Sequence, residues 1–529
     1  MKELIEKIIP KLRFNFPYEI DDYSSNLYME NYHKHSMYSL IDSATSMEDY
    51  ADKIKEYNYK CLFSGEHGWQ GQYFYVYNLC EQIRKDKDNP YDLKFRYSTE
   101  AYWVKDRKKI VLEEYIDKKG QIQTKEKKDN TNCHIILVAK NFEGLEDINF
   151  ALSIANEDGY YYKPRLDFEL LLNINPNNVI VTSACIAGWK YEDAEECWLK
   201  LHKHFKDNFF LEVQNHNTEN QKRLNKRILK LANQNNIQII AGLDTHYISE
   251  EDKIKRENLL ERKNFHYDDE DNWYMDFPNG KEVFKRFKEQ NILSDEQILT
   301  AMMNTCVFIN ECEEIEFDRS FKIPNTYKEL NYKERCDLLD KKLLNYYELE
   351  QFKSDEKLQA ILYEANELKE SNVIDYFLTN EKIIKTAIEE ENGILTTTGR
   401  GSAPSFITNK LLGFTTIDRF TSDIPMYSER FLTKERVIES HQMPDIDFNV
   451  AEQEPFVSAS KKIIGEHSCY PLIAFGQLKE NNAWKLYAGI NNIDPQTSNE
   501  ISKAITEYNK ALKYCETEED KEAIDILEF

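Results

Sequence analysis

Residues 31–249 alternate between short apolar runs and amphipathic stretches, and this alternation constrains the fold more than any other feature of the sequence. Runs with the length and content of buried strands are KCLFSG (60–65), HIILVAK (134–140), NVIVTSA (178–184), FFLEV (209–213) and IQIIAGL (237–243). Helical patterns lie between them, and the one after the good N-cap residue Thr218 places Leu224, Ile228 and Leu231 on one face. Alternating strands and helices predict an α/β domain, either an open sheet or a barrel.

The pattern is interrupted at residues 104–130 and changes after about residue 260. The interruption carries runs of charge and one glycine, which favours a solvent-exposed hairpin insertion over an arm that touches DNA. The later sequence is more helical, and its clearest apolar helix face consists of Leu358, Ile361, Leu362, Ala365 and Leu368. A chain of 529 residues with such a change predicts more than one domain.

Charge, hydropathy and cysteine content limit the class of protein. The net charge of −25 argues against a protein that coats nucleic acid, but a nucleic-acid enzyme needs only a local basic channel. The N-terminal sequence does not resemble a signal peptide, and no apolar run reaches the ~18 residues of a membrane span. Because the ten cysteines form no CxxC pair, we expect reduced thiols in a cytoplasmic protein without membrane contact.

Imidazole, carboxylate and thiol side chains gather near the ends of the apolar runs. These candidate metal ligands are His33, His35, Glu66, His67, Glu100, His134, Cys185, Asp244 and His246. Taken one by one, each is more simply a surface or core residue. Taken together they favour a site, because loops at the carboxyl ends of strands meet at one edge and residues two apart point the same way. So many ligands exceed the need of one tetrahedral ion and predict a cluster of Zn²⁺ or Mn²⁺ ions that activates water on a phosphate ester.

This ordered set resembles the PHP (polymerase and histidinol phosphatase) domain, whose motifs are HxH, a DH-type pair, Glu, His, Cys and a final DxH. One departure is Glu66, where the family usually has Asp. The resemblance implies a distorted (β/α) barrel, a metal site formed by the nine residues named above, and hydrolysis of phosphoesters.

A glycine segment and an acidic motif mark the second half of the chain. In TTTGRGSAPS the glycines free the backbone to approach phosphates, the arginine supplies positive charge, and the serine donates a hydrogen bond. The nucleotide-binding candidates are therefore Gly399, Arg400, Gly401 and Ser402. In MPDIDFNV, Asp445 and Asp447 lie two apart on an expected strand and could both face Mg²⁺. In isolation, a tight turn and a solvated acidic turn explain these two segments better.

In order, however, these segments resemble motifs of the bacterial C-family replicative DNA polymerases of the polymerase III alpha type. The matching segments are KPRLDFELL (163–171), FLEVQNH (210–216), TTGRGSAPSFITNKLLGFTTID (397–418), SERFLTKERV (428–437) and MPDIDFNV (443–450). The implied domains are an N-terminal extension (1–25), a PHP domain (26–260), the first part of a polymerase palm (261–450) and a helical thumb-like segment (451–529). The resemblance implies nucleotidyl transfer from dNTPs to a DNA primer–template, with Asp445 and Asp447 as catalytic residues on Mg²⁺, and a 3′–5′ exonuclease in the PHP domain.

Two departures from the polymerase pattern affect this expectation. Asn449 stands where the family has the third acid of PDxDxD, and the segment with the family's last catalytic Asp has no match before Phe529. We therefore expect that the chain does not polymerise alone and that its partner is a C-terminal polymerase chain or another replisome subunit. The chain could come from a split gene, be a truncated phage-type copy or be a fragment, and the sequence does not choose among these origins. Two other functions also fit the sequence: a PHP phosphoesterase whose palm-like half only binds DNA, and an inactive replisome scaffold.

Overall fold

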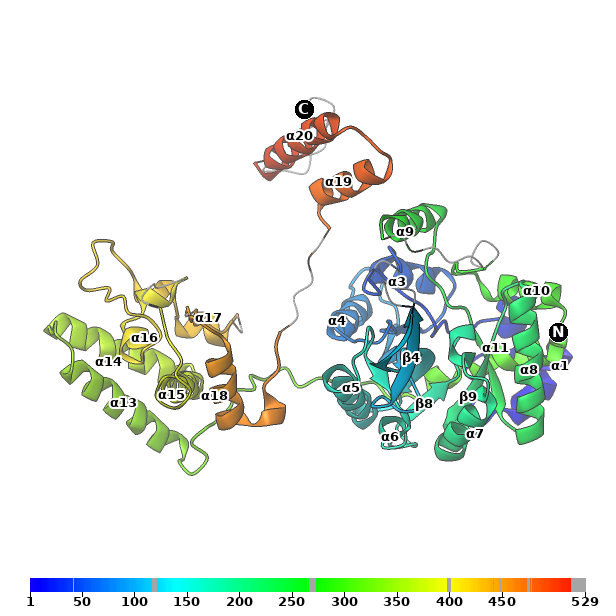
Figure 1. Ribbon diagram of the computed structural model, residues 1–529, viewed down its shortest axis with the longest axis horizontal. Helices are drawn as coiled ribbons and strands as arrows, with labels where there is room; N and C mark the ends of the chain where they lie inside the picture. The colour runs from blue at the N-terminus through cyan, green and yellow to red at the C-terminus, as the bar shows by residue number, and fades with distance from the viewer. Residues whose placement is uncertain are drawn as a thin grey trace. The chain divides into compact units, whose positions relative to one another are not determined.

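Two compact units make up the described chain, Met1–Phe317 with Leu478–Phe529 and Asp318–Gln477 (Figure 1). The computed structural model describes every residue except 41, 117–120, 264, 266–272, 397–400, 441, 448, 473–475, 477 and 515–529. The four domain boundaries expected from the sequence stay a prediction, and residues 261–317 lie in the first unit. Among the helices described, none combines the length with the apolar character that crossing a membrane requires.

The first unit is built on a mixed six-stranded sheet with the order β10–β9–β8–β6–β3–β7. Its strands are β3 (Ser98–Trp103), β6 (Cys133–Ala139), β7 (Arg165–Leu166), β8 (Val179–Thr182), β9 (Phe209–Gln214) and β10 (Gln238–Gly242). Strands β8, β9 and β10 run parallel, whereas β6 is antiparallel to both of its neighbours. The mixed α/β class is therefore confirmed, and closure into a barrel stays an expectation.

A shorter pair of strands lies outside this sheet. Strand β1 (Cys61–Phe63) runs parallel to β2 (Lys94–Arg96), and isolated bridges join Lys34 to Thr245 and His67 to Glu100. All five runs predicted as strands are present, as β1, β6, β8, β9 and β10. The strands β2, β3 and β7 were not predicted, because β2 and β7 are very short and β3 (STEAYW) buries polar residues that carry no apolar signal.

Helices surround the strands of the first unit, except for its last two helices, which pack on each other and, through the first of them, on the helix Glu250–Arg262 (Figure 1). They are α1 (Lys2–Ile8), α2 (Ile20–Asn26), α3 (Met47–Glu56), α4 (Tyr73–Arg84), α5 (Phe142–Glu157), α6 (Phe168–Leu171), α7 (Ala194–Phe205), α8 (Glu219–Asn235), α9 (Glu250–Arg262), α10 (Gly280–Gln290), α11 (Asp295–Asn304), α12 (Val307–Asn310), α19 (Glu480–Ile490) and α20 (Pro495–Lys513). Helix α8 begins as predicted, because Thr218 accepts a hydrogen bond from the amide of Gln221, and Leu224, Ile228 and Leu231 are buried.

The charged interruption forms an antiparallel hairpin of β4 (Ile110–Ile116) and β5 (Ile122–Lys128). Most of its residues are exposed, so the prediction of a solvent-exposed hairpin is confirmed.

The second unit is helical in the described residues. Its helices are α13 (Tyr332–Glu348), α14 (Asp355–Glu370), α15 (Ile374–Glu390), α16 (Ile407–Leu411), α17 (Lys434–Ile438) and α18 (Glu454–Ile464). The predicted apolar face of α14 buries Ile361, Ala365 and Leu368, but Leu362 is 46% exposed, so its inclusion was wrong. The face that packs is narrower than the sequence pattern suggested, because one neighbouring side of α14 faces solvent.

Candidate metal centre

Eight of the nine predicted ligands lie close together in the first unit, in four overlapping groups of three. Within each group the nitrogen, oxygen and sulfur atoms all lie within 4.8 Å of one another. The groups are His35–His67–His246, His33–Glu100–Cys185, His33–His35–Asp244 and His67–Glu100–His134. Because His33, His35, His67 and Glu100 each belong to two groups, the arrangement has the form expected for a cluster of ions.

Backbone pairing brings the first and last of these motifs together. The amide of His35 donates to the carbonyl of Thr245 at 2.7 Å, and the amide of Thr245 donates to the carbonyl of His33 at 3.1 Å. The parallel bridge sets the side chains at 33 and 35 on the same side as those at 244 and 246. Asp244 has a left-handed φ of 52°, a conformation that aspartate tolerates better than most residues.

Glu100 is the central carboxylate of the cluster. One of its oxygens lies 2.8 Å from Nδ1 of His134 and 3.2 Å from Nε2 of His33, and the other lies 2.7 Å from Nδ1 of His67. The sulfur of Cys185, just before a 3₁₀ turn, lies 3.8 Å from the first oxygen. Glu100 projects from β3, while His134 comes from the adjacent strand β6.

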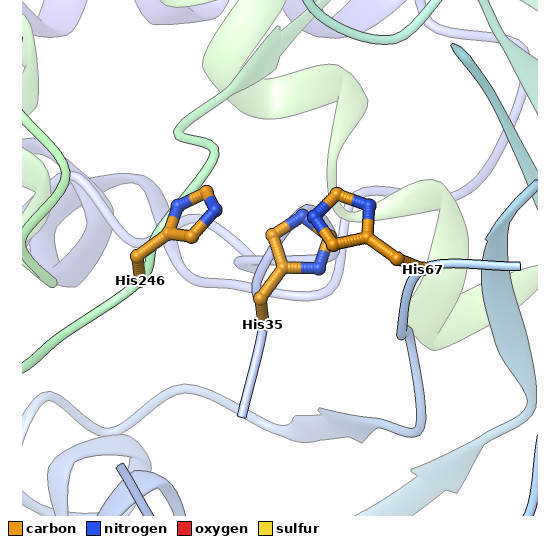
Figure 2. A group of neighbouring side chains, drawn as sticks. All are labelled: His35, His67 and His246. Atoms are coloured by element: carbon orange, nitrogen blue, oxygen red, sulfur yellow. The ribbon is translucent and has the colours of Figure 1, made fainter. Parts of the chain in front are cut away.

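Three of the imidazoles come from separate segments and face one another (Figure 2). The rings of His35 and His67 stack with centroids 3.9 Å apart and an interplanar angle of 11°. The ring of His246 approaches His35 from another side, at 4.7 Å.

Glu66 is the one predicted ligand that the structure does not bring to the cluster. Its carboxylate accepts hydrogen bonds from the hydroxyls of Ser36 and Ser39 and from the amide of Ser36. Neighbouring residues of an extended chain point in opposite directions, so Glu66 faces away when His67 faces inward. Its hydrogen bonds hold the loop that follows His35.

Two carboxylates at the centre were not among the predicted residues. Asp42 places Oδ2 2.9 Å from Nε2 of His67 and 3.4 Å from Nε2 of His246, and its other oxygen accepts from Arg256 at 2.8 Å. Glu212 on β9 lies behind His33, with its Oε1 2.7 Å from Nδ1 of that ring. A glutamate within the apolar run FFLEV was a signal for a buried carboxylate, whereas Asp42 sits in a polar loop that carried none.

Charges in the centre shift one another strongly. Burial opposes ionisation of Glu100, but the imidazoles of His134, His67 and His33 outweigh it and hold its pKa well below the usual range. Burial lowers the pKa of His35 to about 4, and the charge of His67 adds to this effect. An imidazole with such a pKa is unprotonated at neutral pH and is available as a metal ligand.

The buried ring nitrogens fit a shared cation. Nε2 of His33, Nε2 of His35 and Nδ1 of His67 make no aligned hydrogen bond with any described residue, although carboxylate oxygens lie 2.7 to 3.3 Å away. Buried polar atoms without an aligned partner are rare and need an explanation. An ion between these nitrogens and oxygens would satisfy both, and the mixed His, carboxylate and Cys set suits Zn²⁺ or Mn²⁺.

The predicted residues of the second unit are only partly described, since Gly399 and Arg400 lie outside the described residues. Gly401 has φ 66°, and a Cβ atom there would collide with the carboxylate of Asp447. Ser402 precedes a short 3₁₀ turn, Ala403–Ser405. The glycine segment and the acidic motif therefore lie side by side, held by the amide of Thr396, which donates to the carbonyl of Asn449 at 2.9 Å.

The expected strand around Asp445 and Asp447 is absent from the described residues 442–447, so that prediction was wrong. An isolated bridge between Leu395 and Val450 is the extended pairing found nearby. Asp445 is exposed and Asp447 is half-buried, and the four candidate groups of metal ligands all lie in the first unit. An extended segment is a strand only where it pairs in a ladder with another segment, and the described residues 442–447 form no such ladder.

The family model of the PHP domain matches residues 31–216, which include most of the clustered ligands. The model of the bacterial DNA polymerase III alpha NTPase domain matches residues 334–527. The chain thus resembles, domain by domain, a PHP domain followed by part of a bacterial DNA polymerase III alpha subunit.

Relatives named DNA polymerase III subunit alpha align with most of this chain. The protein of Aquifex aeolicus is 26% identical over 500 residues, and that of Borreliella burgdorferi is 27% identical over 495 residues. Each alignment covers 89% of this chain and 40% of the relative. The Helicobacter pylori protein is 24% identical over 523 residues, which cover 89% of this chain and 39% of the relative. The chain therefore spans about two fifths of the length of these relatives.

Proposed function

We propose that the first unit hydrolyses phosphodiesters at the 3′ end of DNA, as the metal-dependent exonuclease of a replicative polymerase of the III alpha type. The observation that carries this proposal is the convergence of imidazole, carboxylate and thiol groups within 4.8 Å in four overlapping triplets. In this proposal a cluster of Zn²⁺ or Mn²⁺ ions is held by His33, His35, His67, Glu100, His134, Cys185, Asp244 and His246, with Asp42 as a further ligand.

The residues of the chain have distinct roles in this chemistry. When bound, the ions supply a Lewis acid and lower the pKa of water so that it can attack phosphorus at neutral pH. Glu212 fixes the orientation of His33 through Nδ1, and Arg256 fixes Asp42 through its outer oxygen. The burial of Glu100 and Asp244 keeps bulk water away and strengthens their hold on cations.

The experiment combines metal analysis with hydrolysis of a 5′-labelled single-stranded oligonucleotide. We expect the purified chain to retain Zn or Mn and to shorten the oligonucleotide from its 3′ end, and His35→Ala with Asp244→Ala to abolish both. A matched control is His204→Ala, because His204 lies on α7 and its Nε2 contacts the carbonyl of Ile174, outside the cluster. Intact oligonucleotide in the presence of fully metal-loaded chain would contradict the proposal and favour the scaffold.

For the second unit we propose participation in nucleotidyl transfer to a primer, with dNTPs and DNA as substrates and Mg²⁺ at Asp445 and Asp447. The contact of Gly401 with Asp447 favours it, because phosphates cradled by the glycine segment would lie next to that carboxylate. Since the chain spans about 40% of its relatives, we propose that polymerisation needs a further polymerase chain or other replisome subunits.

Primer extension tests this second proposal. We expect incorporation only after the C-terminal portion of a relative is added, and loss of that incorporation in Asp447→Asn. Exonuclease activity without any incorporation would select the alternative in which the palm-like unit only grips DNA.

A further inference from the structure

One cation at the edge of the metal centre has no carboxylate partner among the described residues. The ammonium of Lys163 lies 4.9 Å from the centre of the Tyr102 ring, and no ion pair of the described residues includes it. A lone ammonium beside a metal cluster is a candidate site for an anion.

Tyr102 links this lysine to the cluster. Its ring stacks on His67, with centroids 6.0 Å apart and an interplanar angle of 19°, and lies edge-on to His134 at 5.2 Å. Tyr102 is only 5% exposed, so its position is fixed by packing. The close approach depends on Gly68, where a Cβ atom would meet the Tyr102 ring at 2.7 Å and Pro164 at 3.3 Å.

The charge of Lys163 lies within electrostatic reach of Asp42, a carboxylate of the cluster. Although the residue as a whole is exposed, burial of its ammonium lowers the pKa of Lys163; the carboxylate of Asp42 opposes that shift, and the nearby charge of Lys190 adds to it. Asp42 itself contacts the rings of His67 and His246. Lys163 therefore lies on the side of the centre formed by Asp42 and His67. A stacked ammonium also loses little side-chain entropy when it binds an anion, because the aromatic face already restricts it.

We propose that Lys163, seated on Tyr102, binds a phosphate of the DNA strand next to the one that is hydrolysed. This inference rests on the proposed exonuclease function and deepens it, since it makes the substrate a chain of phosphates and not a phosphate monoester. One ammonium neutralises one backbone phosphate, so the contact contributes to affinity and to its dependence on salt. The contact carries no base specificity, as suits an enzyme that removes any nucleotide.

The chain offers a matched control. Lys105 also lies on an aromatic ring, 4.7 Å from the centre of Tyr191, but it forms an ion pair with Asp193. Replacing either lysine by glutamine removes one cation–π contact and one charge. A difference between the two variants therefore reports the lack of a carboxylate partner at Lys163 and its place beside the metal centre.

The test measures binding of a fluorescein-labelled single-stranded oligothymidylate to the full 529-residue chain by anisotropy, over a series of NaCl concentrations. Phosphorothioate linkages at the 3′ end slow hydrolysis. We expect Lys163→Gln to weaken binding about tenfold, as for a charge-assisted hydrogen bond. We also expect the slope of log affinity against log salt to become shallower by about 0.7, the value for one phosphate of a single strand. Lys163→Arg should restore most of the affinity, and Lys105→Gln should leave both quantities unchanged.

Hydrolysis separates this inference from the proposed function. Lys163→Gln should raise KM for the oligonucleotide with little change in kcat, and leave hydrolysis of bis(p-nitrophenyl) phosphate unchanged, because that ester has a single phosphate. An unchanged salt slope, or an equal loss with both substrates, would overturn the assignment. If the wild type cleaves neither substrate, the exonuclease proposal fails, and the salt slope of Lys163→Gln still decides whether Lys163 binds phosphate. Metal content equal to that of the wild type shows that the variant keeps its centre.

Discussion

The carboxylate of Glu212 lies 2.7 Å from Nδ1 of His33, and the opposite nitrogen of the same ring faces Glu100 at 3.2 Å and Asp244 at 3.1 Å. Glu212 is itself held by the hydroxyl of Tyr32 at 2.8 Å. A carboxylate behind an imidazole fixes the ring and raises its basicity as a ligand. The relationship therefore turns a buried histidine into an oriented ligand.

Glu212→Gln should weaken metal binding by about 10- to 100-fold, because the amide no longer enforces the proton on Nδ1 of His33. Competition with a chromogenic chelator measures this affinity. Glu219→Gln, on the exposed first turn of α8, is the control and should bind like the wild type. Equal affinity in Glu212→Gln would show that Glu212 does not support His33.

Gly242→Ala should displace the same carboxylate, because a Cβ at Gly242 would collide with the carboxylate of Glu212. We expect a loss of about 1–3 kcal/mol in the free energy of unfolding, together with weaker metal binding. Urea titrations followed by tryptophan fluorescence measure the first quantity. Gly489→Ala is the matched control, since nothing lies within 4 Å of a Cβ there and the helix α19 favours alanine. Equal losses of unfolding free energy in Gly242→Ala and Gly489→Ala would contradict the proposed collision with Glu212.

Asp42→Asn and Glu66→Gln should differ in metal content. Asp42 contacts His67 and His246, whereas Glu66 binds Ser36 and Ser39. We expect Asp42→Asn to lower the metal-to-protein ratio measured by plasma mass spectrometry and Glu66→Gln to leave it unchanged. Metal loss in Glu66→Gln alone would reverse these roles and support the original sequence interpretation.

Removal of metal should destabilise the first unit selectively. The tryptophans of the chain, at positions 69, 103, 189, 198, 273 and 484, all belong to that unit, so their fluorescence reports it alone. At free metal about 100-fold above Kd, the bound ion stabilises by about 2.7 kcal/mol. We expect chelation to lower the urea midpoint seen by fluorescence by a corresponding amount. An unchanged midpoint would mean that the cluster holds no ion in the folded state.

The second unit should lose stability as the pH rises from about 4.5 to 7. Burial raises the pKa of Glu364 to about 7, although the amide of Thr408 and the guanidinium of Arg419 oppose this shift. The folded state then binds the Glu364 proton more tightly than the unfolded state does. The stabilisation that this proton gives is therefore complete at pH values below the unfolded pKa near 4.5 and is lost above about pH 7. The loss should reach about 1–3 kcal/mol.

Scanning calorimetry of the second unit's transition at several pH values measures this dependence. Glu364→Gln should flatten it between pH about 4.5 and 7, whereas Glu370→Gln, at an exposed ion pair with Lys434, should not. A pH profile of Glu364→Gln identical to that of the wild type would exclude Glu364 as its source.

The sequence by itself determined the α/β class, the buried strands and the identity of most candidate ligands. This was possible because strands β6, β8, β9 and β10 are apolar enough to be recognised locally, and because the side-chain period of a strand is two residues. The order of His, Glu, Cys and Asp residues along the chain then allowed the candidate metal ligands to be predicted.

Only the tertiary structure decided which side chains meet. Glu66 and His67 are neighbours in sequence, but an extended backbone sends them to opposite sides, so one joins Ser36 and the other joins the cluster. Asp42 enters the centre through a loop, and Glu212 enters from behind through β9. Contacts of this kind join residues far apart in the chain, and local sequence patterns record neither the direction of a side chain nor its distant partners.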